Sequence, residues 1–172
     1  FICQPPIRGS TAAAMLWQAL ANGSVDIIST DHCPFSAEAK KLGEHNFTLT
    51  PGGVPGLETR LALVHTFGVL AGHFTLNRWV EACCTLPADL HGMTHKGHLI
   101  PGYDADIVLF DPYKEMTYSA DTLHSNLSYT PYEGITVTGV PITTISRGEI
   151  IVEDGQFIGA RGRGRFLKRR YE

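Results

Sequence analysis

The sequence lacks the marks of a membrane protein, of a disulfide-stabilised secreted protein and of a structural zinc domain. It holds no run of about 18 apolar residues, so no membrane-spanning helix is predicted. Its four cysteines form no CxxC pair, which argues against a zinc ribbon and against a disulfide framework. Reduced thiols in a cytoplasmic protein are therefore expected.

Charge of either sign is also scarce. Charged residues make up 18% of the 172 residues and the formal net charge is −3, so neither nucleic acid nor a membrane surface is expected as a partner. Hydrophobic residues make up 43%, enough to bury a core. The chain opens without an initiator Met or a leader, and we expect it to be part of a longer protein.

The first half of the chain has a helix–strand–helix pattern. Residues 12–22 have a helical period, and the apolar run at residues 25–29 predicts a strand buried on both faces, as in a parallel sheet. A loop follows at residues 30–56, and connections this long are usually functional. Helices are predicted at residues 57–71 and again after Thr75, which can cap a helix.

The second half changes character near residue 96. Short β-rich runs separated by glycines predict strands, and Asp154 and Gly155 between two of these runs predict a hairpin. The runs lie at residues 106–110, 135–138, 142–145, 149–152 and 156–158.

Asp31 is the sharpest candidate for chemistry. It directly follows the predicted buried strand, and in parallel α/β folds the carboxyl ends of the strands carry the active site. A carboxylate there can bind a metal and take a proton from metal-bound water. On position alone the commoner alternative is that Asp31 caps a turn, because aspartate is frequent in turns.

Several segments resemble the hydantoinase/dihydropyrimidinase branch of the amidohydrolase superfamily. The sequence STDHCPF at residues 29–35 is similar to the motif of the eighth barrel strand in that branch. The other similar segments follow in the family's order at residues 42–47, 51–60, 96–112, 129–134 and 146–155. Each segment alone is weak, but the shared order along nearly the whole chain makes the resemblance specific.

The resemblance implies an α/β fold with two parts. Residues 1–95 would supply the last strands and helices of a (β/α)8 metal-dependent hydrolase barrel. Residues 96–172 would form part of a small β-sandwich and a C-terminal tail.

The resemblance also assigns roles to four residues. Asp31 would be the metal-binding carboxylate of the last barrel strand and the general base, which then protonates the leaving nitrogen. Gln4 and Gly52 would lie where family members hold the cyclic imide through main-chain groups, although Ser and Asn are usual there. His32 would line the substrate pocket or orient a ligand, with a plain loop role as the alternative.

The implied cofactor is a pair of zinc ions in each full-length subunit. The family binds them with a His-x-His pair, a carboxylated lysine and two further histidines, yet no Lys or His precedes Asp31. A catalytic zinc needs about three protein ligands and a full barrel about 250 residues. His91, His95 and His98 are interpreted as part of a linker, because glycines interrupt their spacing.

The function implied for the full-length protein is hydrolysis of a C–N bond in a small cyclic amide or imide, of the hydantoin or dihydropyrimidine type. A homotetramer or homodimer is the implied assembly. Alternatives are an allantoinase, a dihydroorotase, a non-catalytic dihydropyrimidinase-related scaffold and an unrelated α/β binding domain. Phe35 disfavours the dihydroorotase, because such enzymes place a carboxylate-binding His there.

We predict that the isolated 172-residue polypeptide binds zinc weakly and hydrolyses neither hydantoin nor dihydrouracil, because one carboxylate cannot hold two metals. Zinc titration and a hydrolysis assay check this. Tight binding of two zinc ions together with turnover would contradict it.

Overall fold

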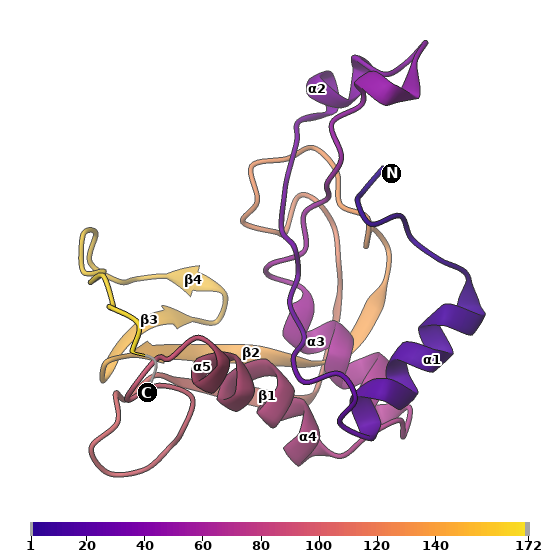
Figure 1. The fold of residues 1–172 in the computed structure, drawn as a ribbon. Coiled ribbons are helices and arrows are strands. Elements are labelled where there is room, and N and C mark those ends of the chain that lie inside the picture. The colour runs from indigo at the N-terminus through magenta and orange to yellow at the C-terminus, as the bar shows by residue number, and fades with distance from the viewer. Residues whose placement is uncertain (1, 171–172) are drawn as a thin grey trace.

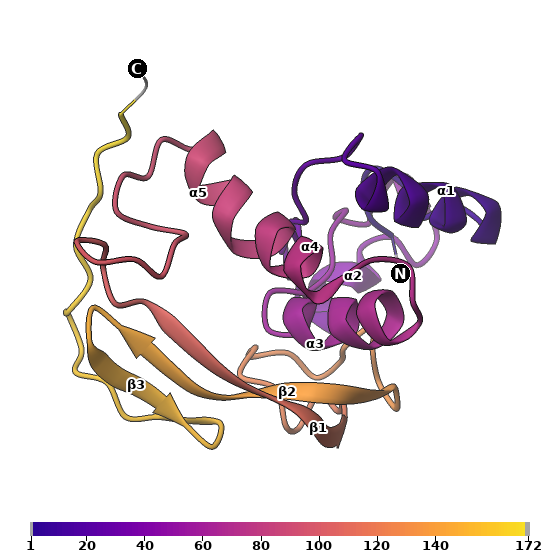
Figure 2. The same cartoon turned by 90° about the horizontal axis from the view of Figure 1, so that it is seen from below.

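The computed structural model describes residues 2–170 and has helices layered over one face of an antiparallel sheet (Figures 1 and 2). Five α-helices are present in the described part of the chain: α1 (Ser10–Ala21), α2 (Ala37–Lys41), α3 (Arg60–Val64), α4 (Leu76–Val80) and α5 (Leu86–Leu90). Between them lie a 3-10 helix, η1 (Phe47–Leu49), and two π-helical segments, η2 (His65–Leu70) and η3 (Glu81–Thr85). The strands are β1 (Ile107–Thr117), β2 (Thr136–Ser146), β3 (Glu149–Glu153) and β4 (Gln156–Phe157).

The predicted helices are confirmed, with shifted ends. α1 begins at Ser10, two residues before the predicted start, and its N-cap is Gly9. The predicted helix at residues 57–71 begins only at Arg60 as α3 and continues as the π-helical η2. Thr75 caps α4 as predicted, because its hydroxyl accepts a hydrogen bond from the backbone N–H of Arg78.

The strand predicted at residues 25–29 is wrong, because the described chain forms no ladder there. A strand is defined by hydrogen bonds to a neighbouring strand, and here side chains take that place. Arg78 donates to the carbonyl of Val25 at 2.7 Å and Arg60 donates to that of Ile28 at 2.8 Å. The backbone N–H of Ile28 donates to the carbonyl of Ala82, in the helical layer, at 3.1 Å.

The sheet has the simple order β1-β2-β3-β4, with every neighbouring pair antiparallel. The two runs predicted at residues 135–138 and 142–145 form one continuous strand, β2. The predicted hairpin is confirmed, because Asp154 and Gly155 connect β3 to β4 with φ values of 45° and 76°. Positive φ at both central residues is the requirement of the tight turn that suits twisted strands.

The described chain contains helices and a sheet, in keeping with the expected α/β class, while the barrel and the sandwich, with a boundary near residue 95, stay predictions. Within residues 2–170, no helix has both the length and the apolar character needed to cross a bilayer. The four cysteines are free thiols, and burial raises the pKa of Cys83 to about 11.

Helices and sheet meet around His65, of which only 2% is exposed. Its Nδ1 lies 2.7 Å from the carbonyl oxygen of Thr138 in β2, and its ring packs edge-on against Phe110 of β1. Trp79 of α4 packs against both rings. Gly139 allows this approach, since a Cβ there would lie 2.4 Å from Nδ1 of His65, and its φ of 98° disfavours any side chain.

We predict that Gly139→Ala lowers the free energy of unfolding by about 2–5 kcal/mol, because a left-handed backbone and a crowded contact are penalised together. Gly148→Ala is the matched control, since Gly148 has a φ of 80° but open space around it. Its cost should be about 1–2 kcal/mol. Urea denaturation measures both, and equal losses would contradict the packing argument.

Candidate functional site

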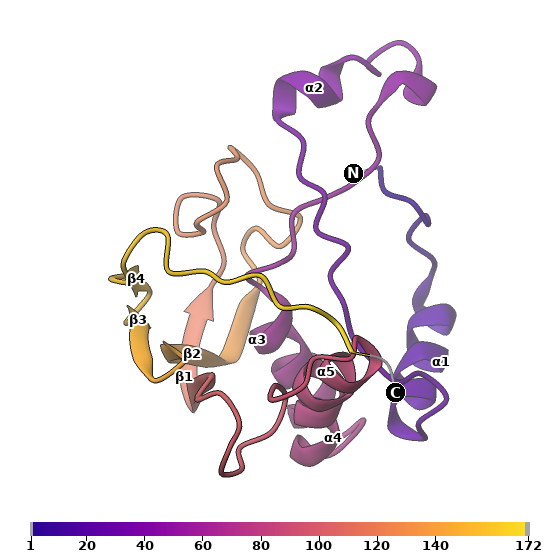
Figure 3. The same ribbon diagram turned by 60° about the vertical axis from the view of Figure 1, so that its left-hand side comes forward.

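The predicted loop at residues 30–56 is an arm that projects from the body of the molecule, with α2 and η1 at its tip (Figures 1 and 3). Its two legs are joined where the N–H of Cys33 donates to the carbonyl of Val54 at 3.2 Å. The oxygen of Ser36 caps α2 by accepting from Ala39, which lets a five-residue helix form at the tip. The arm is thus ordered, although its glycines and prolines predict only a loop.

Asp31 begins the first leg of this arm. Its side chain is exposed, and within residues 2–170 it has no hydrogen bond or ion pair and borders neither of the two cavities described below. Its φ of 43° lies in the left-handed region, which aspartate tolerates better than most residues. Asp31 is therefore an available carboxylate, and the barrel mouth expected around it is not formed by the described residues alone.

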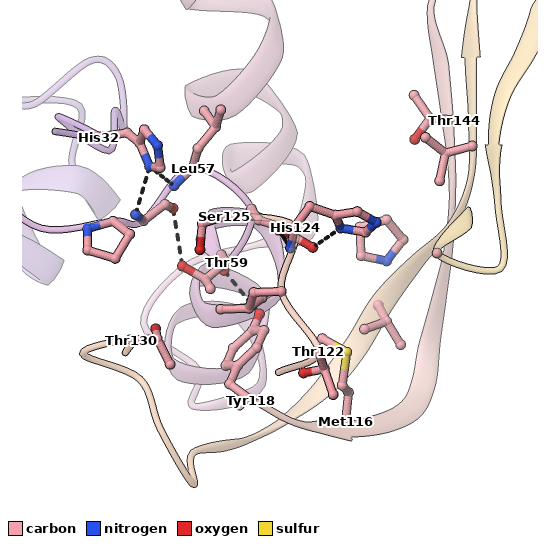
Figure 4. A pocket seen from close by; sticks show the side chains of 18 of the residues that line it. His32, Leu57, Thr59, Met116, Tyr118, Thr122, His124, Ser125, Thr130 and Thr144 are labelled. Carbon is pink, nitrogen blue, oxygen red and sulfur yellow. Dashed lines mark hydrogen bonds and ion pairs between the residues drawn. The ribbon is translucent and has the colours of Figure 1, made fainter. Parts of the chain in front are cut away.

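His32 fastens the arm to the start of the helical layer. Its Nδ1 accepts hydrogen bonds from the backbone N–H groups of Gly56 and Leu57, at 3.0 and 3.1 Å (Figure 4). A ring nitrogen that accepts carries no proton, so the proton of the neutral ring is on Nε2. His32 thus stabilises the loop, which was the alternative expected for it. Its Nε2–H group stays available as a donor.

Gln4 and Gly52, far apart in sequence, lie side by side. A Cβ built on Gly52 would be 3.4 Å from Cγ of Gln4. The next residue, Gly53, donates its N–H to the carbonyl of Ile2 at 2.9 Å and approaches the carbonyl of Cys33 so closely that a Cβ would lie 2.4 Å from it. The N-terminal segment, the second leg of the arm and the segment after Asp31 therefore converge.

Lys40 is the residue of this region that sequence reasoning missed. Its ammonium nitrogen lies 2.6 Å from the carbonyl oxygens of Pro51 and Gly53 and 3.2 Å from that of Ile2. It also lies 5.4 Å from the centre of the Phe35 ring. Contacts to backbone carbonyls leave no motif in a sequence, so no pattern could have singled out Lys40 from its neighbour Lys41.

Residues 129–134, one of the segments that resemble the family, pack on the arm. The hydroxyl of Tyr129 donates to the carbonyl of Phe35 at 2.7 Å, and burial raises the pKa of this tyrosine. The hydroxyl of Tyr132 would be 3.5 Å from a Cβ built on Gly56. Two tyrosines from the C-terminal half thus contact both legs of the arm.

A cavity of about 730 Å³ separates the helical layer from the hairpin of β3 and β4, and His32 lies at its edge (Figure 4). Nδ1 of His124 pairs with Glu58 at 2.7 Å beside it, and this hydrogen bond raises the pKa of His124. The hydroxyl of buried Tyr118 donates to the carbonyl of Thr59. A second cavity of about 360 Å³ lies between α1 and residues 25–29.

The described residues do not by themselves fit a two-metal centre. No three His, Cys, Asp or Glu side chains of residues 2–170 come together as a metal site. The histidines interpreted as a linker have other contacts: His95 and His98 pack edge-on against Tyr103, and His98 lies 3.5 Å from Asp89. The metal-ligand role expected of Asp31 from the sequence therefore stays a prediction.

Comparison with known proteins confirms the resemblance to hydantoinases and dihydropyrimidinases. The chain is 41% identical to the D-phenylhydantoinase of Escherichia coli O1:K1 / APEC, over 99% of this chain and 37% of that protein. Its structure matches a dihydropyrimidinase from Brevibacillus agri NCHU1002 with a TM-score of 0.96 and 41% identity, over 98% of this chain and 37% of that one. A D-hydantoinase (dihydropyrimidinase) from Thermus sp. matches with a TM-score of 0.95 and 42% identity, over the same shares.

The chain thus spans 37% of the length of these relatives. Residues 7–151 match the model of the amidohydrolase family, which is most of the chain. The protein therefore belongs to the amidohydrolase family.

Proposed function

We propose that the full-length protein hydrolyses a C–N bond in a cyclic amide or imide of the hydantoin or dihydropyrimidine type. The observation that carries this proposal is 41% identity to a D-phenylhydantoinase along 99% of the chain, together with a TM-score of 0.96 to a dihydropyrimidinase. The unrelated α/β binding domain is set aside, because the family match covers residues 7–151.

Asp31 is proposed as the catalytic carboxylate and as the metal ligand that this chain contributes. Its side chain is exposed and unpaired among residues 2–170, so it is free to accept a proton. It takes the proton of the attacking water as the oxygen bonds to the ring carbonyl carbon. It then gives that proton to the ring nitrogen as the C–N bond breaks, so Asp31 returns to its starting state.

Amidohydrolases generally use a divalent metal. We propose two zinc ions in each full-length subunit, with the ligands other than Asp31 supplied from outside this chain. No three His, Cys, Asp or Glu side chains among residues 2–170 lie together, so Asp31 is proposed as a single ligand and no further metal chemistry is proposed for this chain.

Gln4, Gly52 and His32 are proposed to bind the substrate ring. The proximity of Gln4 to Gly52 supports a shared role, since a Cβ built on Gly52 would lie 3.4 Å from Cγ of Gln4. His32 adds an Nε2–H donor on the residue next to Asp31, because Nδ1 is occupied by the amides of Gly56 and Leu57.

The remaining expectations stay proposals for the full-length protein. They are a barrel formed with residues 1–95, a sandwich formed with residues 96–172, a cytoplasmic location and a homotetramer or homodimer. Allantoinase remains the alternative substrate class, and a scaffold remains the non-catalytic one. Phe35 contributes its ring to the contact with Lys40 and its carbonyl to Tyr129, which further disfavours a carboxylate-binding role at this position.

We predict that Asp31→Asn in the full-length protein lowers kcat/KM for its preferred ring by at least about 10³-fold, because the amide side chain cannot accept the proton. Hydantoin, dihydrouracil, allantoin and dihydroorotate form the substrate panel. Asp26→Asn is the control, since Asp26 is also exposed and lies in the same extended segment. Unchanged turnover in Asp31→Asn would overturn the assignment, and an inactive parent protein would favour the scaffold.

A further inference from the structure

We propose that Lys40 is a positioning residue, whose ammonium group holds the two substrate-contacting segments, residues 2–4 and 51–53, in one arrangement. The inference rests on the proposed function for Gln4 and Gly52 and adds a residue that touches neither the ring nor the metal.

The first argument is the match between donors and acceptors. A lysine ammonium has three N–H donors, and here three carbonyl oxygens surround it. Two of the contacts, to Pro51 and Gly53, are short, at 2.6 Å, and a charged donor shortens a hydrogen bond relative to a neutral one. The third reaches Ile2 at 3.2 Å, so one side chain joins two segments that are distant in sequence.

The second argument concerns which carbonyls are held. Those of Pro51 and Gly53 flank Gly52, and that of Ile2 lies two residues before Gln4. In a planar trans peptide the N–H points opposite to the C=O, so anchoring the carbonyl of Pro51 turns the N–H of Gly52 away from Lys40. The ammonium thereby fixes the direction of a main-chain group that is proposed to bind the ring.

The third argument is that Lys40 has no carboxylate partner among residues 2–170, unlike its neighbour. Lys41 pairs with Glu38 at 2.9 Å on the exposed side of α2, whereas Lys40 is half-buried against Phe35. The partly buried ammonium group of Lys40 is therefore stabilised by the three carbonyl oxygens and by the Phe35 ring. Among residues 2–170, the ammonium group of Lys40 therefore contacts the backbone proposed to bind the substrate and forms no ion pair.

The test compares Lys40→Met with Lys41→Met in the full-length, metal-loaded protein, with hydantoin and dihydrouracil as probes. Met keeps most of the apolar length of the side chain and removes the donors. We expect Lys40→Met to lower kcat/KM on the order of 10²-fold, mainly through KM, because ring-binding groups are displaced while Asp31 is not. Lys41→Met should leave both constants unchanged, since it loses only an exposed ion pair.

Lys40→Arg restores a charged donor and should recover part of the loss, although a planar guanidinium fits three converging carbonyls less well. Zinc content and the thermal midpoint are measured alongside. A loss confined to kcat, or one that follows zinc content in every variant, would overturn the positioning role and leave a structural one.

Hydrogen exchange separates this inference from the proposed function. In Lys40→Met, the backbone amides of Gly52, Gly53 and Val54 should exchange faster than in Lys41→Met. If the parent protein hydrolyses no ring of the panel, the proposed function fails, yet faster exchange would still show that Lys40 orders these segments. Unchanged exchange together with unchanged KM would overturn the inference itself.

Discussion

Pairing of backbone carbonyls by cationic side chains is the interaction on which the N-terminal half depends. Its extended segments form no ladder among the described residues, and an unpaired buried carbonyl is costly. Arg60 and Arg78 donate to carbonyls of residues 25–28, and Lys40 donates to those of Ile2, Pro51 and Gly53. Each cation lies on or beside a helix, so the pairing also fixes how the extended segments lie against the helical layer.

This pairing brings the candidate site together. Gly53 approaches both Ile2 and the backbone after Asp31, which places Gln4 and Gly52 in contact. His32 accepts from two amides at the start of the helical layer and so joins the arm to the body. The residues with proposed roles thus come from three segments whose relative placement is set by main-chain contacts.

The two halves of the chain contact each other at two places. His65 joins the helical layer to β2 through the carbonyl of Thr138, where Gly139 provides the space for its ring. Tyr129 joins the C-terminal half to the arm through the carbonyl of Phe35. The C-terminal half therefore supports the arm that carries the proposed site, a physical reason for the two halves to occur together.

The sequence by itself determined the family resemblance, the helices α1, α3 and α4, the strands after residue 106, the hairpin at Asp154 and the choice of Asp31. These follow from local periods, turn residues and motifs, which depend on neighbours along the chain. Only the tertiary structure decided that residues 25–29 are not a strand here, that Gln4 meets Gly52 and that Lys40 rather than Lys41 lies among three carbonyls. A strand needs a partner, and any residue offers a backbone carbonyl, so residue types in the sequence do not reveal which carbonyls a side chain will reach.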